Sequence, residues 1–243
     1  GRLDRVVIRN VTGTYKSFGF YIEPWFNKTG GNYGSIIFDT VDLRALQPNY
    51  TYRTPVLFSV GGTIENLILR NITTHQPSDD RVLVDLGAAS CMQGLGENGD
   101  IPQMNIKSVL VDGLRIYEDT DKAAEAAYIQ VHGPVGSLVV RDVEVLRTAD
   151  VPVAGALVEI QPDAAVRTLL VEDVLAERIS RIVSHKAGEI QHLCLRHVMA
   201  QETTEPAVTV EAGRIGRLTV HSVTGTAPSS VVGDGGIDSI ETV

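Results

Sequence analysis

The chain has no excess of positive charge and no long apolar run, and both absences narrow the classes of protein to which it can belong. Its 243 residues include 21 Lys and Arg against 30 Asp and Glu, which gives a net charge of −9 and a pI near 5.1. This balance argues against nucleic acid and anionic membranes as partners. No apolar run approaches the length of a membrane span, and the sequence shows no signal-peptide pattern. We therefore expect neither nucleic-acid binding nor membrane insertion.

Motifs of the common cofactor and nucleophile chemistries are absent too. Nothing resembles a P-loop, a dinucleotide fingerprint, a nucleophile elbow or a catalytic Cys/His pair, and the histidines lack the spacing of metal ligands. Asp119 and Asp121 offer carboxylates for a Ca²⁺ ion, but no complete ligand loop surrounds them,. We interpret them as an acidic surface turn and expect no cofactor.

Aromatic residues are missing from the second half of the chain. The single Trp, the seven Tyr and the five Phe all lie before residue 129. The same part of the chain carries four long irregular stretches, at 24–33, 45–54, 87–105 and 118–125. Long loops on a rigid scaffold often carry binding and catalysis. Trp25, Tyr50 and Tyr52 fall in these stretches, and exposed aromatic rings suit the faces of sugars.

A short phrase recurs along the whole chain: an aliphatic residue, two spacers and a short aliphatic strand that ends in a charge and a turn residue. Clear copies are residues 64–72, 135–143 and 190–198. The fourth position of the phrase falls at Val6, Ile36, Leu67, Val109, Leu138, Leu169, Leu193, Leu218 and Ile240, so the repeat length varies from 22 to 42 residues. A strand-based period of this size indicates stacked coils.

The repeat predicts an all-β fold, a single-stranded right-handed parallel β-helix of about eight to nine coils. Each phrase is followed by a second apolar alternation that often ends in Gly, which is typical of a half-buried strand. Each strand then pairs with its counterpart one coil away, at about 4.8 Å. A leucine-rich-repeat horseshoe is the main alternative, but it needs helical limbs and repeats of even length. We expect one β-helix domain over residues 1–243.

Outward charges next to the inward columns alternate in sign. The column reads Arg9, Asp39, Arg70, Asp112, Arg141, Glu172, Arg196 and His221. Opposite charges attract at strand spacing, so this pattern favours in-register pairing rather than catalysis. Asn10 and Asn71 stand at the turn position of the phrase, where Asn is expected for backbone reasons.

The second strand of each coil also has a polar column, and it supplies the candidate catalytic residues. The alignment places Glu23, Ser59, Asp85, Gln130, Glu159, His185 and Glu211 in this column. Glu23 and Asp85 then lie two coils apart, about 9–10 Å between strand positions, near the ~6.5–9.5 Å spacing of carboxyl groups in inverting glycosidases. The preceding loop adds His75, Asp79, Asp80 and Arg81.

Residues 3–11 and 64–72, with their Ile-x-x-Leu-x-Leu-x-Asn-Val style, resemble the repeat of the pectin-lyase-like β-helix superfamily. This superfamily includes polygalacturonases, pectate lyases, related glycosidases and phage tailspikes. Of the three polygalacturonase signatures, Asn-Thr-Asp, Asp-Asp and Gly-His-Gly, the chain has only Asp79-Asp80. In pectate lyases a basic residue beside an acid cluster acts as the general base, which Arg81 beside Asp79, Asp80 and Asp85 would match. The resemblance implies an extracellular, cell-surface or virion location.

Two hypotheses about function follow. The first is a carbohydrate-active protein of glycoside hydrolase type, or secondly a lyase, acting on a polysaccharide or oligosaccharide. Glu23, Asp79, Asp80 and Asp85 would then perform acid/base chemistry, His75 and Arg81 would bind substrate, and Trp25, Tyr50 and Tyr52 would stack on sugars. The second is a non-catalytic structural or adhesive module, such as a segment of a tailspike or adhesin.

The ends of the chain fall inside a repeat, so we expect it to be a segment of a longer protein. Open coil ends expose core residues and strand edges, which a homotrimer or adjoining domains would cover. Cys91 and Cys194 fall four coils apart, roughly 19 Å at strand spacing, which is beyond the reach of a disulfide,.

Overall fold

The computed structural model describes residues 1–22, 31–46, 56–76, 82–87, 104–118, 127–147 and 153–243. Within these ranges every regular element is a strand, and the strands form two parallel sheets. Sheet A has the order β1-β3-β5-β7-β9-β11-β13-β15-β17. Its strands are β1 (Leu3–Tyr15), β3 (Asn32–Ala45), β5 (Thr63–Gln76), β7 (Asn105–Glu118), β9 (Pro134–Arg147), β11 (Ala165–Glu177), β13 (Glu189–Gln201), β15 (Arg214–Thr224) and β17 (Gly236–Thr242).

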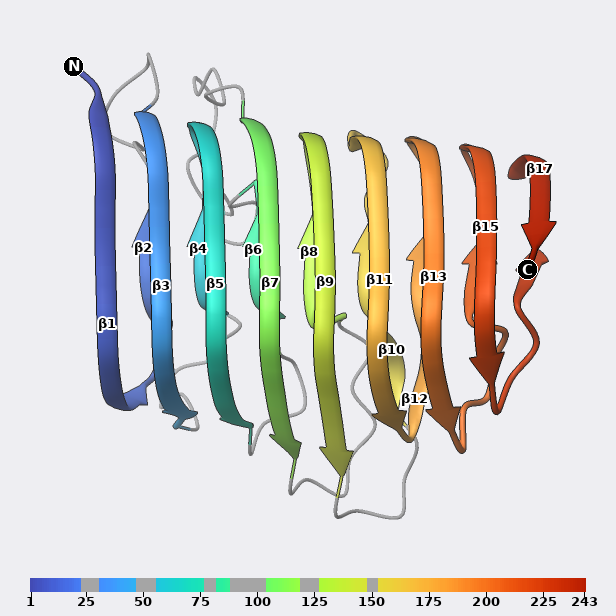
Figure 1. Cartoon of the computed structure of the whole chain (residues 1–243), viewed down its shortest axis with the longest axis horizontal. Coiled ribbons are helices and arrows are strands. Elements are labelled where there is room, and N and C mark those ends of the chain that lie inside the picture. Colours follow the sequence, from blue (N-terminus) through green and yellow to red (C-terminus); the bar gives the residue numbers. More distant parts are fainter. Residues whose placement is uncertain (23–30, 47–55, 77–81, 88–103, 119–126, 148–152) are drawn as a thin grey trace.

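Sheet B is built from the shorter strands between them, in the order β16-β14-β12-β10-β8-β6-β4-β2. These strands are β2 (Phe18–Ile22), β4 (Val56–Val60), β6 (Val82–Leu86), β8 (Ile129–Val131), β10 (Val153–Ile160), β12 (Ile179–His185), β14 (Val208–Val210) and β16 (Ser229–Val231). Each strand pairs with the strand two places along the chain, so every coil contributes one strand to each sheet (Figure 1). The expected all-β parallel β-helix is confirmed.

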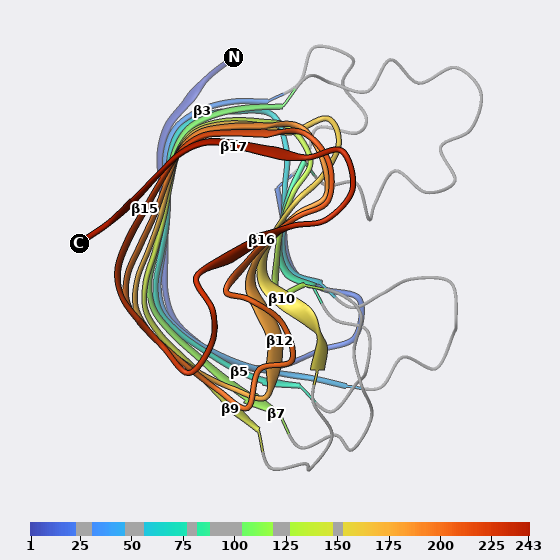
Figure 2. The ribbon, with the colours of Figure 1, turned by 90° about the vertical axis from the view of Figure 1, so that its right-hand side faces the viewer.

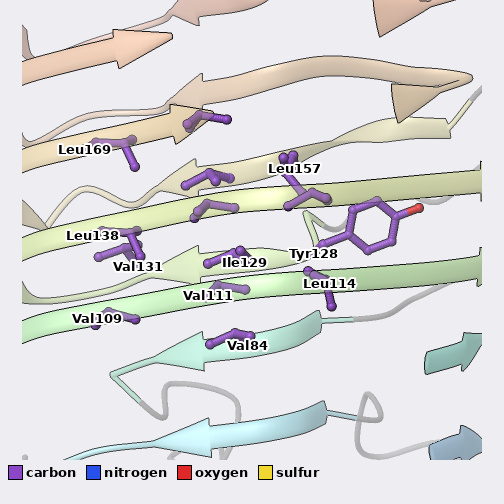
Figure 3. Close-up of a cluster of buried hydrophobic side chains, with 14 of the residues drawn as sticks. Val84, Val109, Val111, Leu114, Tyr128, Ile129, Val131, Leu138, Leu157 and Leu169 are labelled. Atoms are coloured by element: carbon purple, nitrogen blue, oxygen red, sulfur yellow. The ribbon is translucent and has the colours of Figure 1, made fainter. Parts of the chain in front are cut away.

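The two sheets enclose a single core. Seen along the stack, the long strands of sheet A curve around the core and sheet B closes the remaining side (Figure 2). The two predicted inward columns of sheet A are in register from coil to coil, as in Ile36↔Leu67 and Phe38↔Leu69. Side chains of sheet B such as Val84, Ile129 and Val131 meet them inside (Figure 3). Each fully buried aliphatic side chain contributes about 1.5–3 kcal/mol, and the stack repeats that contribution in every coil.

Each long strand bends at one residue with a left-handed backbone. The column of these residues is Asn10, Thr40, Asn71, Gly113, Asp142, Asp173, His197 and Ser222, with φ between 49° and 77°. Strand pairing skips this position in every coil and resumes at the next residue. Asn, Asp and Gly tolerate the left-handed region best, which explains the turn residue that ends each phrase. The predicted turn role of Asn10 and Asn71 is confirmed.

The alternating charges form the predicted ladder on the outside of sheet A. Neighbouring members are direct strand partners, such as Asp39↔Arg70 and Glu172↔Arg196. Arg141 Nη2 lies 2.9 Å from Asp112 Oδ2, and Arg196 Nη1 lies 2.8 Å from Glu172 Oε1. The bond to Arg141, opposed in part by desolvation, holds the pKa of Asp112 below its ordinary value. The ladder is a device for register, since exposed pairs contribute only about 0–1 kcal/mol each.

Candidate functional site

Two adjacent rows of polar side chains run along the outer face of sheet B. The first row follows the strand register and contains Ser59, Asp85, Gln130, Glu159, Ser184 and Thr209. The second row lies two residues further along each coil, where the backbone N–H bonds to the preceding coil, and contains Gly87, His132, Gln161, Lys186 and Glu211. Positions two apart on a strand share a face, so the two rows form one polar surface.

Asp85 and His132 come together near the start of this surface. Asp85 is 1 % exposed, and its Oδ1 lies 3.6 Å from His132 Nε2. His132 can approach because Gly87 precedes it in the second row: a Cβ on Gly87 would meet the Cβ of His132 at 2.7 Å. The glycine therefore lets the imidazole lie against the coil of Asp85.

The surroundings of His132 decide where its proton lies. The Nε2 atom is 3.3 Å from Gln130 Oε1 and also faces the Asp85 carboxylate. With the Gln130 amide assigned in this orientation, both neighbours are hydrogen-bond acceptors, which favours the tautomer with the proton on Nε2 and the lone pair on Nδ1. Burial lowers the pKa of His132 below its ordinary value of 6.5, with Asp85 and Asp163 opposing this. A neutral imidazole with one free nitrogen is the form required of a general base.

Glu159 stands one coil further along, next to Gln130. Its Oε1 accepts hydrogen bonds from Gln130 Nε2 at 3.5 Å and from Gln161 Nε2 at 2.5 Å. Burial raises the pKa of Glu159 above its ordinary 4.5, and Glu211 adds to this while Lys186 and Arg181 oppose it. Burial is the largest cause of both shifts and moves each group toward its neutral form, which suits the imidazole to accept a proton and the carboxyl to donate one,. His132 and Glu159 form such a pair on neighbouring coils.

A cluster of ion pairs borders the surface at the following coils. Lys186 Nζ lies 2.5 Å from Glu211 Oε1, and Arg181 bridges Glu211 at 3.5 Å and Glu205 at 2.5 Å. These cations face Glu159 without a direct hydrogen bond to it among the described contacts. They moderate the rise in its pKa rather than reversing it.

The structure places few of the residues that the sequence predicted for the site. Asp85 lies on the outer face of sheet B, as predicted. Glu23, Trp25, Tyr50, Tyr52, Asp79, Asp80 and Arg81 lie outside the described residues, as do Asp119 and Asp121. The predicted spacing between Glu23 and Asp85 rested on an incorrect register, because the partner of Ser59 in β2 is Tyr21.

His75 lies on sheet A rather than beside Asp85. Its ring stacks on Tyr117 with centroids 5.2 Å apart, and its Nε2 is 3.3 Å from Asp42 Oδ1. Two members of the predicted polar column were also wrong. His185 is the partner of Ile160 and Val210 and is fully buried in the core, and Glu211 belongs to the second row.

The position of His132 beside Asp85 and Gln130 was missed from the sequence, although a signal was present. His132 follows Gln130 by two residues and therefore shares its face. Gln130 and Glu159 were placed in the polar column but were not predicted to be catalytic residues. Gln130 and Glu159 differ from the other polar residues of the column in the side chains that lie next to them on the neighbouring coils. These neighbours are known only once the strand register is known.

In the described ranges, no group of three or more His, Cys, Asp or Glu side chains is placed to hold a metal ion. The same ranges contain no helix of the length and hydropathy needed to cross a membrane. Comparison of the chain with protein-family models, with curated proteins and with solved structures gave no match.

Proposed function

We propose that the outer face of sheet B is an acid/base site that acts on a polysaccharide or oligosaccharide. The observation that supports this most is the row of contacts on neighbouring coils that joins His132 to Glu159 through Gln130, with Nε2 of His132 3.3 Å from Gln130 Oε1 and Gln130 Nε2 3.5 Å from Glu159 Oε1. A parallel β-helix is compatible with the pectin-lyase-like superfamily, and the resemblance of the repeat favours a glycan over other substrates. Fold likeness alone does not assign an activity, so the chemistry of the side chains carries the argument.

In this proposal Glu159 is the general acid and His132 the general base. The protonated carboxyl of Glu159 gives its proton to the glycosidic oxygen as the bond to the sugar carbon breaks. His132 Nδ1 takes a proton from water, and the resulting hydroxide adds to that carbon, which is hydrolysis. Asp85 positions the imidazole and stabilises its charged form. In the second-choice reaction, a lyase, His132 takes the proton from a ring carbon and a double bond forms as the leaving oxygen departs.

Polysaccharide turnover tests the proposal. The chain is incubated with neutral and acidic polysaccharides, and new reducing ends and unsaturated products are measured separately. Glu159→Gln and His132→Gln should each lower the rate by about 10²–10⁴-fold. Glu172→Gln is the matched control, because it makes the same change on the sheet A ladder of the next strand, and it should leave the rate unchanged. Equal losses in Glu159→Gln and Glu172→Gln would contradict the assignment.

A specific observation favours the second candidate function, a non-catalytic adhesive or structural module. Asp85, Ser184 and Thr209 are 1 %, 2 % and 4 % exposed, so much of the first row is closed to a ligand. Under this alternative the parent chain binds a glycan array but releases no product from any bound glycan. Turnover of even one polysaccharide, lost in Glu159→Gln, would exclude it.

A further inference from the structure

A second candidate site lies on sheet A, away from the two rows of sheet B. A pocket of about 490 Å³ opens at the start of β7, β9, β11 and β13. Its polar lining includes Asn105, Lys107, Arg167, Glu189 and Gln191, and Gly136 lies among them. This volume falls in the range of about 300–1,000 Å³ that is usual for small-molecule sites.

The strand register places two cations on either side of Gly136. Lys107 on β7 and Arg167 on β11 are its neighbours in the column, because the flanking residues pair directly. Two ladder steps separate the cations, about 9.6 Å between backbone positions. Gly136 places no side chain between them and itself lines the pocket; a Cβ there would meet the backbone oxygen of Lys107 at 2.5 Å, so a larger residue does not fit at this position without a shift of the backbone. Among the described residues, neither Lys107 nor Arg167 has an ion-pair or hydrogen-bond partner.

Three coils earlier, the same column contains a second glycine between two side chains of like charge. Gly34 lies between Asp4 and Glu65, two like charges two coils apart. The guanidinium of Arg2 fills this gap: its Nε is 2.8 Å from Asp4 Oδ1 and its Nη2 is 3.0 Å from Glu65 Oε1. A Cβ on Gly34 would lie 3.2 Å from Arg2 Nη2. A glycine flanked by two like charges therefore forms a seat for one planar group of opposite charge.

At Gly136 the signs are reversed and no described residue fills the gap. We propose that the pocket binds a small ligand through one oxyanion group, a carboxylate or a phosphate, held between Lys107 and Arg167. The guanidinium fork suits two oxygens of such a group, and the ammonium adds a third donor. Asn105, Gln191 and Glu189 are placed to exchange hydrogen bonds with hydroxyl groups of the same ligand. This site does not depend on the function proposed for sheet B.

Calorimetric titration of the full chain with inorganic phosphate, glucuronate and glucose tests the proposal. We expect one site that binds phosphate or glucuronate and weakens with added salt, and no binding of glucose there. The tighter of the two anions identifies the source of the oxyanion. Lys107→Gln and Arg167→Gln should each weaken binding by about tenfold or more, as for the loss of a charged hydrogen bond.

Arg44→Gln is the matched control, because Arg44 is an exposed arginine on β3 without a described partner, distant from the pocket. It removes the same net charge and should leave the affinity unchanged. All three side chains are exposed, so thermal unfolding should confirm that the variants fold. The proposal is overturned if neither anion binds, if glucose binds as well as glucuronate, or if Arg44→Gln weakens binding as much as Arg167→Gln.

Discussion

Two arginine–carboxylate pairs join β7 to β9 and differ chiefly in burial. Arg141 Nη2 lies 2.9 Å from Asp112 Oδ2, with the side chains 45 % and 21 % exposed. Arg147 Nε lies 2.8 Å from Glu118 Oε2, and neither side chain is exposed at all. Because both pairs join an arginine of β9 to a carboxylate of β7, they compare a buried ion pair with an exposed one between the same two strands.

Removal of each arginine should therefore have very different costs. Arg147→Met leaves the buried carboxylate of Glu118 without this partner, which costs about 3–5 kcal/mol. Arg141→Met costs at most about 1 kcal/mol, and Asp112 keeps Arg70 at 3.8 Å. At roughly 2–4 °C per kcal/mol for a chain of this size, the midpoint of thermal unfolding falls by roughly 6–20 °C in the first variant. In the second it falls by at most about 4 °C.

Thermal and urea unfolding followed by circular dichroism measure both variants. The double variant Glu118→Met/Arg147→Met should recover most of the loss, because two apolar side chains replace both charges of the pair. Burial lowers the pKa of the Arg147 guanidinium, in keeping with a large desolvation cost. If Arg147→Met were no more destabilising than Arg141→Met, Glu118 would have to be neutral or otherwise compensated, and the reasoning would fail.

Three further predictions concern the ladders and the core. Thr40→Asn should stabilise the fold by up to about 1 kcal/mol in urea unfolding, because Thr40 is a β-branched residue at φ 61° and Asn tolerates that region better. Burial lowers the pKa of His185 below 6.5, so the unfolded chain binds more protons in acid. Stability should then fall as the pH drops below about 6.5 and through the folded pKa, and in His185→Phe a pH series of melting curves should lose this part of the slope. Arg196→Glu should cost about 0.2–1 kcal/mol by setting like charges beside Glu172, and the swap Glu172→Arg/Arg196→Glu should recover only part of this loss in urea unfolding, because its new arginine lies beside Arg141.

Sheet A was predictable from the sequence to the level of individual partners. Its strands are long and carry an inward column, an outward charge column and a turn residue at fixed offsets. A shift by one residue would bring Arg70 into the core and an aliphatic residue out, so the pattern has one acceptable register. The predicted pairings of Asp39 with Arg70 and of Glu172 with Arg196 follow from this.

The register of sheet B was not predictable in the same way. Its strands are short, from three to eight residues, and connections of unequal length lead into them. The number of residues after the phrase therefore does not give the position of a residue in the strand of sheet B. His185 shows the consequence: its polarity predicted an outward position, yet it occupies the core column of Val131 and Ile160. The pattern of apolar and polar residues assigns a histidine to the outer face, so it does not predict a neutral imidazole in the core.

The candidate sites arise where a column departs from its own rule. On sheet A, opposite charges on successive coils satisfy one another, and such a column has no chemistry left to offer a ligand. In the first row of sheet B, Asp85 and Glu159 are instead separated by the neutral Gln130, so the strand neighbour of Glu159 on β8 is not a cation. Burial raises the pKa of Glu159, and Lys186 and Arg181 only partly oppose this. On sheet A, Lys107 and Arg167 also break the alternation of opposite charges, because these two like charges lie on either side of a glycine. In a stack of near-identical coils, an unmatched charge is therefore the feature that separates a site from the scaffold, and it can be found only after the register is known.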